Sequence, residues 1–256
     1  MTDLLVVDDV KVWFGGVKAV DGISLTIREG LIHGVVGPNG SGKTTLINAI
    51  SRVTPVTAGS IFLDDADVTT ARSFRVGRLG LARTFQGIRL IPTLTVLQNV
   101  MLGVDYRLMW PEGEHPRPVW TRVAHRQILA RAEAALERVG IAHTAKKLPG
   151  ELSYGSQRRV EIGRAIAGNP RLLLLDEPVA GMNKRERVEI ADLLLSLKAD
   201  GITQLLVEHD LRMVLDVSDH LFVANFGKLI AEGEPEMTAS RPEVVEAYLG
   251  HRREKP

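Results

Sequence analysis

The sequence contains no cysteine among its 256 residues. This absence excludes disulfide bonds, catalytic thiolates and metal sites built from cysteine. It is compatible with a reducing compartment such as the cytoplasm. No apolar run reaches the roughly 18 residues that favour a membrane-spanning helix. We therefore expect a soluble protein, or one that reaches a membrane only through a partner.

The charges nearly cancel, with 32 Lys and Arg against 31 Asp and Glu and a net charge of +1. Bulk charge therefore gives no electrostatic argument for a nucleic-acid partner. Residues 1–5 lack the basic start and the long apolar core of a signal peptide. The length allows one large or two modest domains.

The most specific motif lies in residues 37–45 and fits the pattern Gly-x-x-x-x-Gly-Lys-Ser/Thr of a phosphate-binding loop. It follows an apolar run expected as a strand and precedes residues 46–50, expected as a helix. This context favours a phosphate loop over a glycine-rich turn that holds a lysine by chance. The predicted nucleotide-binding residues are Gly37, Pro38, Asn39, Gly40, Ser41, Gly42, Lys43, Thr44 and Thr45.

Each part of this loop has a chemical role. Glycines allow a tight turn whose N–H groups point at a phosphate chain. The start of the following helix adds partial positive charge at the same place. Lys43 is expected to reach the β- and γ-phosphates, and Thr44 to ligate Mg²⁺.

The rest of the chain indicates an α/β fold with a helical insertion. Residues 4–14 and 23–35 are rich in β-formers and predict an antiparallel β layer that leads into the phosphate-loop strand. Residues 80–86 predict a further short strand. From about residue 92 to 168 the pattern is helical, with segments at 94–102 and 123–139. A proline-rich stretch with Trp110 and Trp120 is expected as a loop between these segments.

The α/β pattern returns after residue 170. Residues 172–176 and 204–209 predict buried parallel strands, residues 184–198 an amphipathic helix, and residues 219–233 a final hairpin. We therefore predict a P-loop NTPase core with a parallel sheet, formed by residues 1–88 and 169–256. The inserted α-helical subdomain spans about residues 89–168.

Two acidic residues close the strand at 172–176. Parallel strands present ligands at their carboxyl ends, so Asp176 is expected to lie beside Thr44 and hold Mg²⁺, directly or through water. Glu177 is then placed to accept a proton from the water that attacks the γ-phosphate. The alternative is an acid pair that ends a strand in salt bridges.

A second anion-binding site is indicated at residues 152–159. Ser153 and Gly155 stand at the start of a helical pattern, where a hydroxyl, free N–H groups and the helix dipole meet. Taken alone, this stretch is more typical of an ordinary N-capped helix.

The phosphate loop, Gln86, residues 152–155, Asp176-Glu177 and His209 occur in this order along nearly the whole chain. Together they resemble the ATP-binding subunit of an ABC transporter. The resemblance implies the ABC ATPase fold, with ATP and Mg²⁺ as ligands. It implies that Gln86 senses Mg²⁺ and water, and that His209 contacts the γ-phosphate. Phe14 would stack on adenine, with its neighbour Trp13 as the alternative.

The resemblance also implies a two-subunit site in which Ser153 and Gly155 complete the site of the opposite subunit. Ser156 stands where the family usually has Gln, and Asn183 where it usually has Asp. We therefore assign no phosphate contact to Ser156 and no charge across the dimer to Asn183.

Finer features are similar to the branched-chain amino acid importers, among them residues 14–21, 82–86, 208–210 and 241–250. Residues 176–182 lean toward the related urea and amide importers, and lipopolysaccharide-export ATPases are more distant. The implied partners are membrane permeases, a second ATP-binding subunit (a sister or a copy) and, indirectly, an external solute-binding protein. The implied location is the cytoplasmic face of the inner membrane.

Two other classes compete with this interpretation. A non-transport ABC ATPase acting on DNA or ribosomes usually carries two cassettes or a long coiled coil, and the chain has neither, nor a basic stripe. A phosphate-loop kinase or GTPase would leave residues 152–155 and His209 unexplained.

Overall fold

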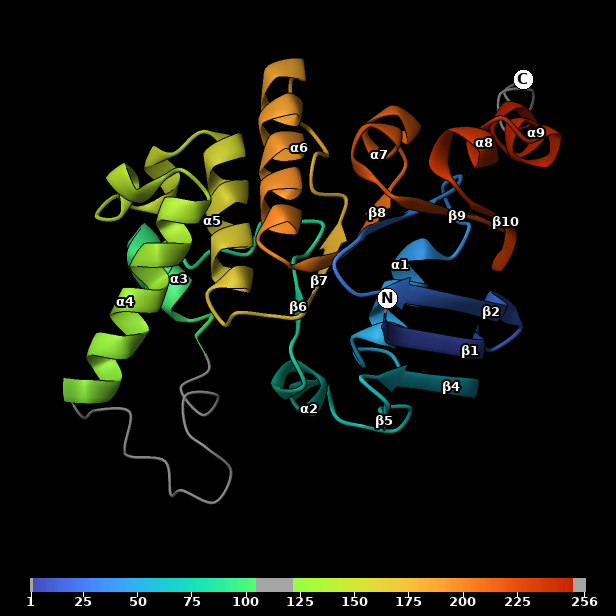
Figure 1. Ribbon diagram of the computed structural model, residues 1–256, viewed down its shortest axis with the longest axis horizontal. Coiled ribbons are helices and arrows are strands. Elements are labelled where there is room, and N and C mark those ends of the chain that lie inside the picture. The colour runs from blue at the N-terminus through green and yellow to red at the C-terminus, as the bar shows by residue number, and fades with distance from the viewer. Residues whose placement is uncertain (1, 105–121, 251–256) are drawn as a thin grey trace.

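A computed structural model describes residues 2–104 and 122–250 (Figure 1). Two β-sheets lie together in Figure 1. Helices α3, α4 and α5 lie at the left of the view, beyond β6 and β7. The strands are β1 (Asp3–Phe14), β2 (Val17–Arg28), β3 (Ile32–Val36), β4 (Ala58–Leu63), β5 (Ala66–Asp67), β6 (Leu81–Arg83), β7 (Leu172–Asp176), β8 (Thr203–Glu208), β9 (His220–Asn225) and β10 (Lys228–Gly233). The helices are α1 (Lys43–Ile50), α2 (Ser73–Arg78), α3 (Val96–Met101), α4 (Arg122–Arg138), α5 (Tyr154–Ile166), α6 (Lys184–Ala199), α7 (Leu211–Val217), α8 (Pro235–Ala239) and α9 (Pro242–Gly250), with 3₁₀ turns η2 (Ala142–Thr144) and η3 (Pro149–Glu151).

The smaller sheet is antiparallel and confirms the predicted N-terminal β layer. In the described residues its strand order is β2-β1-β4-β5. β1 and β2 pair from Asp3↔Arg28 to Phe14↔Val17, and a tight turn joins them. Alternating residues of both strands are buried, so one face of this sheet packs inward and the other faces solvent.

The larger sheet is mostly parallel and carries the site. Its order within the described residues is β10-β9-β3-β8-β7-β6, and β10 is its antiparallel edge. The register pairs Val36 with Glu208 and Asp176 with Val207. The carboxyl ends of β3, β8 and β7 therefore meet at one edge of the sheet.

The β7 strand shows why its sequence is an uninterrupted apolar run. Leu172 and Leu174 belong to the core shared with α1 and the antiparallel sheet. Leu173 and Leu175 belong to the core on the opposite face, which includes residues of α5, α6 and α7. A strand that is buried on both faces needs apolar side chains at every position.

The strand predicted at residues 80–86 is shorter than expected. β6 ends at Arg83, after pairing with Leu172–Leu174 of β7. The N–H of Thr84 still donates to the carbonyl oxygen of Leu174, but the carbonyls of Phe85 and Gln86 accept hydrogen bonds from the Arg158 side chain instead of joining the ladder. This side-chain anchor is the physical reason for the early end.

The other predicted elements agree with the structure. The helices near residues 94–102, 123–139 and 184–198 and the hairpin at 219–233 are confirmed. Helices α2, α7, α8 and α9 were not predicted. Trp110 and Trp120 lie outside the described residues, and the proposed subdomain boundaries stay a prediction. Within residues 2–104 and 122–250, no helix combines the length and the apolar character needed to span a membrane.

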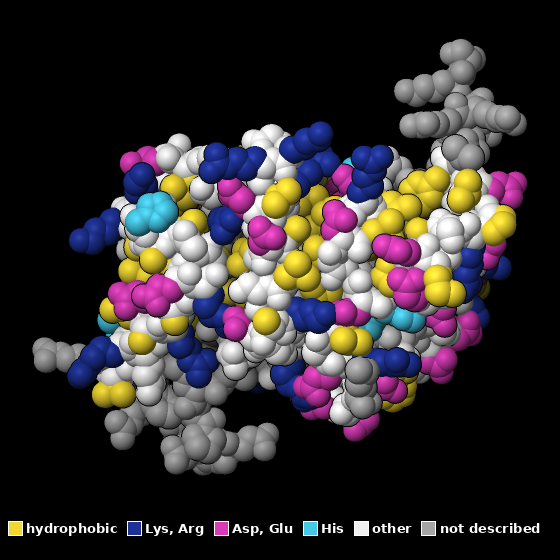
Figure 2. Space-filling view, turned by 45° about the horizontal axis from the view of Figure 1, so that its top comes forward, with side chains coloured by type: hydrophobic (Ala, Val, Ile, Leu, Met, Phe, Trp, Pro, Cys, Tyr) yellow, Lys and Arg dark blue, Asp and Glu magenta, His cyan; other side chains and the backbone are white. Residues whose placement is uncertain are grey.

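The face drawn in Figure 2 carries charges of both signs. Lys and Arg side chains alternate with Asp and Glu over the helices, and apolar side chains lie between them. This face therefore presents no continuous basic stripe of the kind that follows a nucleic-acid backbone.

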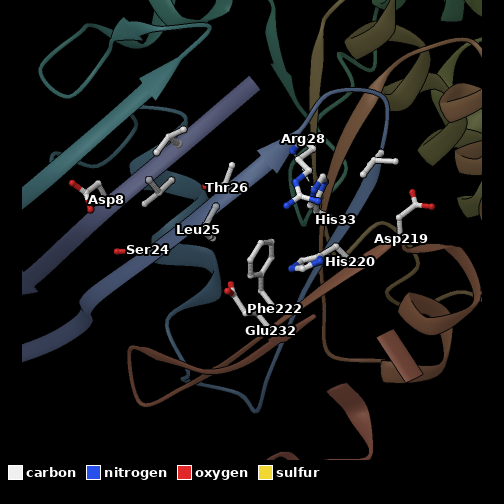
Figure 3. A pocket seen from close by; sticks show the side chains of 13 residues that line it. Asp8, Ser24, Leu25, Thr26, Arg28, His33, Asp219, His220, Phe222 and Glu232 are labelled. Atoms are coloured by element: carbon white, nitrogen blue, oxygen red, sulfur yellow. Dashed lines mark hydrogen bonds between the residues drawn. The ribbon is translucent and has the colours of Figure 1, made fainter. Parts of the chain in front are cut away.

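A cavity of about 450 Å³ is lined by residues of the antiparallel sheet and of β3, β9 and β10 (Figure 3). His33 lies in its wall with only 1% of its surface exposed, and its Nε2 atom accepts the backbone N–H of Arg28 at 3.2 Å. The rings of His33 and Phe222 stack with centroids 6.2 Å apart. Burial, with the neighbouring His220, lowers the pKa of His33 to about 4.

This buried imidazole predicts a pH dependence of stability. Because the folded-state pKa of His33 lies below the ordinary histidine value of 6.5, the unfolded chain binds the proton more readily. The stability from neutral His33 is fully present above pH 6.5 and is lost as the pH falls toward 4. We expect a loss of about 2 kcal/mol between pH 7 and 5, measured by urea unfolding. His33→Gln should remove most of this slope, whereas His143→Gln, at an exposed position, should keep it; equal slopes in both variants would contradict the account.

Candidate functional site

The loop after β3 requires glycine at two positions. A Cβ on Gly37 would lie 2.0 Å from the carbonyl oxygen of Ala224, and one on Gly42 would lie 2.2 Å from that of Ala19. Gly42 also has a φ of 99°. Only glycine accommodates this backbone against its neighbours. Parts of β2 and β9 therefore hold the loop in its curved form.

Lys43 supplies a buried positive charge at the centre of this loop. Its Nζ atom donates to the carbonyl oxygens of Gly37 at 2.7 Å and Pro38 at 2.9 Å. Burial lowers the pKa of Lys43, and the carboxylates of Glu177 and Asp176 oppose this effect. The start of α1 has no side-chain cap and no acidic residue in its first turn. The loop thus combines a lysine with uncapped helix N–H groups, which suits a phosphate group.

A cavity of about 610 Å³ opens over the loop. Seven of the nine predicted loop residues contribute to it, together with two of the predicted catalytic residues. Its lining is Val17, Lys18, Ala19, Asn39, Gly40, Ser41, Gly42, Lys43, Thr44, Thr45, Gln86, Glu177 and Phe226. Segments far apart in the sequence therefore share one cavity.

The three predicted catalytic residues lie together at the carboxyl edge of the sheet. Gln86 Nε2 donates to Glu177 Oε2 at 2.9 Å. His209 Nδ1 lies 3.7 Å from Glu177 Oε1, and half of its side chain is exposed. Glu177 has a φ of 46°, which is strained for a residue with a side chain. Such strain gathers at functional sites.

Asp176 lies just inside this edge and is buried. Its Oδ2 atom accepts from Arg83 Nη2 at 2.9 Å. Its Oδ1 atom is buried without a hydrogen-bond partner. Burial raises the pKa of Asp176, and the Arg83 guanidinium opposes the rise. An unpartnered carboxylate oxygen at the end of β7 fits a water ligand of Mg²⁺.

The described residues contain no cluster of three or more His, Cys, Asp or Glu that could enclose a metal. A magnesium site at this edge does not require such a cluster. Mg²⁺ usually keeps several waters and binds through one or two carboxylates plus substrate phosphates. A site built on Thr44, Asp176 and the phosphates of a nucleotide needs no such cluster.

Ser153 and Gly155 lie away from this cavity. Ser153 is the N-cap of α5, and its Oγ accepts the Ser156 N–H at 3.3 Å. Neither Ser153 nor Gly155 is among the cavity residues. Figure 1 shows α5 and α1 on different sides of β7. Within one chain, then, the structure does not bring these two predicted phosphate contacts to the phosphate loop. Asn183 caps α6 by accepting the Glu186 N–H at 3.0 Å.

The predicted adenine contact, Phe14, ends β1 and is 54% exposed. Trp13 is 40% exposed, and the Lys18 ammonium lies 4.9 Å from the centre of its ring. Neither aromatic residue is among the cavity residues, whereas Phe226 is. The sequence pattern gave no reason to single out Phe226.

Sequence reasoning also missed a buried charge network that holds the segment around Gln86. Arg158 is fully buried in α5 and donates to the carbonyl oxygens of Phe85 and Gln86, each at 2.7 Å. Its guanidinium also pairs with Glu161 at 2.8 Å. Glu161 in turn accepts the Arg89 N–H at 2.8 Å. The sequence feature that could have indicated this network is an Arg and a Glu three residues apart on an otherwise apolar helix face.

Comparison with known proteins adds three results. A family model described as "ABC transporter" matches residues 20–180. The branched-chain amino acid transport ATP-binding protein BraF of Pseudomonas aeruginosa is 36% identical over 250 residues, which is 96% of this chain and 98% of that protein. LivG of Escherichia coli, described in the same terms, is 37% identical over 96% of this chain and 98% of its own length.

Solved structures agree in fold. A nucleotide-free ATP-binding cassette of an ABC transporter superposes with a TM-score of 0.84 and 34% identity, over 96% of this chain and 99% of that one. A cassette in its ADP conformation gives 0.85 and 34%, over 98% and 100%. A dimeric cassette bound to ADP and phosphate gives 0.75 and 26%, over 91% and 99%.

The Arg158 network predicts a large effect on stability. Arg158→Ala leaves the Glu161 carboxylate and two backbone carbonyls without their buried partner. Breaking such a pair costs about 3–5 kcal/mol, which urea unfolding can measure. The matched control is Arg185→Ala, whose side chain is 89% exposed in its ion pair with Glu189. We expect the control to stay within about 1 kcal/mol of wild type. Equal effects of the two changes would refute the assigned role of Arg158.

Proposed function

The chain belongs to the ABC transporter family, and from that membership we propose that it is the ATP-hydrolysing subunit of an importer for branched-chain amino acids. Its relatives BraF and LivG are named as branched-chain amino acid transport ATP-binding proteins, and they match it over nearly their whole length. Binding and hydrolysis of ATP would supply the free energy for uptake through separate membrane permeases.

One observation carries the enzymatic part of this proposal. The phosphate loop, Gln86 and Glu177 line the same cavity, although the sequence separates them widely. An ATPase needs a loop that binds the phosphates on one side of the γ-phosphate and a proton acceptor on the other side. A cavity with both at the carboxyl edge of a parallel sheet supports ATP hydrolysis.

We assign the following roles within this site. Lys43 binds the β- and γ-phosphates, and the N–H groups of residues 40–45 orient them. Glu177 accepts the proton of the attacking water. The side chain of Gln86, held at 2.9 Å from Glu177, positions that water. His209 is placed to contact the γ-phosphate oxygens from the end of β8.

Mg²⁺ is the metal that this site would take. Thr44 and Asp176 would hold it together with phosphate oxygens and water. When bound, it neutralises the charge that develops on the phosphates. The buried, unpartnered Oδ1 of Asp176 supports this assignment.

The working site is proposed to be shared between two ATP-binding subunits. Ser153 and Gly155 stand at the start of α5 and lie outside the cavity of their own chain. A second subunit facing the phosphate loop would bring these groups to the γ-phosphate, as in a head-to-tail pair. The second subunit is a sister protein or a copy of this chain.

The transport part of the proposal names the remaining partners. Permease subunits would receive the movement of the helices, and an external solute-binding protein would deliver the solute. The chain would act at the cytoplasmic face of the inner membrane. The test is to isolate the membrane complex through a tag on this chain and to measure uptake of labelled leucine in proteoliposomes. ATP-dependent leucine uptake supports the proposal; uptake of urea or amides but not leucine would replace it with the related importer class.

Lys43→Ala is expected to lose ATP binding, because the loop loses its buried cation. Isothermal titration should give an affinity at least about 100-fold weaker, since charge-assisted contacts to phosphate are the strongest in the loop. Lys146→Ala, at an exposed position outside the site, should bind as wild type does. Unchanged affinity in Lys43→Ala would refute the phosphate role.

Glu177→Gln is expected to keep ATP binding and lose turnover. The amide has the same shape but cannot accept the proton, so phosphate release should fall by about 100-fold or more. Glu133→Gln, on the exposed side of α4, serves as the matched control. A wild-type rate in Glu177→Gln would remove this residue from the mechanism.

A further inference from the structure

Phe226 occupies an unusual position in the turn between β9 and β10. Its side chain is 76% exposed, and its backbone has a φ of 45°. Large side chains rarely adopt this left-handed conformation. Exposing an aromatic ring also forgoes the benefit of burying it. Both the left-handed backbone and the exposed ring of Phe226 therefore cost folding free energy. This cost suggests that the residue has a function.

Hydrogen bonds fix this turn against the phosphate loop. The N–H of Gly227 donates to the carbonyl oxygen of Ser41 at 3.1 Å, and its carbonyl accepts the Asp21 N–H at 2.8 Å. A Cβ on Gly227 would lie 3.0 Å from the carbonyl oxygen of Lys18. The turn thus packs directly on β2 and on the loop. Phe226 is consequently held at a set place beside the loop.

The lining of the cavity divides into two groups. Gln86 and Glu177 mark the end at which the γ-phosphate would react. Val17, Lys18, Ala19 and Phe226 contribute neither a phosphate cradle nor a proton acceptor. With the phosphates in the loop, these residues are left for the ribose and the base. Phe226 is the aromatic residue among the described residues that line the cavity.

We propose that Phe226 is a nucleoside-contacting residue, whose ring packs against the adenine base of bound ATP. This inference rests on the proposed ATP-binding function. Aromatic side chains stack on bases through their π-faces. The contact would recruit the exposed ring for binding and would offset the strain of its backbone. It would also place an aromatic wall in the turn after β9, separate from the aromatic residues at the end of β1.

The test compares ATP with tripolyphosphate, which has the same phosphate chain and no base. Isothermal titration with Mg²⁺ should show that Phe226→Ala binds ATP about five- to 100-fold more weakly. Its affinity for tripolyphosphate should stay at the wild-type value. Phe226→Tyr should retain ATP affinity, and Phe226→Leu should lose most of the aromatic contribution. Phe74→Ala removes another exposed phenylalanine, 57% exposed on α2, and should match wild type.

Two results would overturn the inference. Wild-type ATP affinity in Phe226→Ala would show that the ring makes no contact with the nucleoside. Equal losses for ATP and tripolyphosphate would show that the residue only supports the phosphate loop. Both results leave the proposed function intact. That function fails instead if the folded wild-type chain binds neither ATP nor tripolyphosphate.

Discussion

The parallel pairing of β3, β8 and β7 is the constraint on which the site depends. The register of Val36 with Glu208 and of Asp176 with Val207 sets three strand ends level with one another. The phosphate loop continues from the first of these strands, His209 from the second and Glu177 from the third. Because both faces of the sheet are buried, a one-residue slip of a strand would exchange its side chains between two differently packed cores. Packing in the core therefore determines the geometry of the proposed catalytic edge.

A second constraint joins this edge to the helices. The buried guanidinium of Arg158 binds the carbonyl oxygens of Phe85 and Gln86, and so connects α5 to the segment that carries a proposed catalytic side chain. Ser153, at the start of the same helix, is proposed to serve the site of a second subunit. The same helix thus contacts the segment of one proposed site through Arg158 and would reach another site through Ser153. In the proposed pair, α5 would then link the two sites physically.

The sequence predicted most of the fold because its signals were local. The phosphate loop required glycine where the structure has close backbone contacts, and the apolar run at 172–175 indicated a strand buried on both faces. Arg158 and Phe226 could not be predicted in the same way. The importance of each comes from contacts with segments distant in sequence, and neither belongs to a spacing motif. The extent of β6 was wrong for the same reason, since a side chain from α5 ends that strand.

The most direct test of the account is a crystal structure of the Glu177→Gln chain with ATP and Mg²⁺. We predict that the triphosphate binds to residues 37–45 and that Lys43 contacts the β- and γ-phosphates. Mg²⁺ should lie between the side chains of Thr44 and Asp176. The Gln86 side chain should lie within reach of the metal or its waters. A triphosphate bound elsewhere, or a metal remote from Thr44 and Asp176, would contradict the claim that the carboxyl edge of the parallel sheet is the ATPase site.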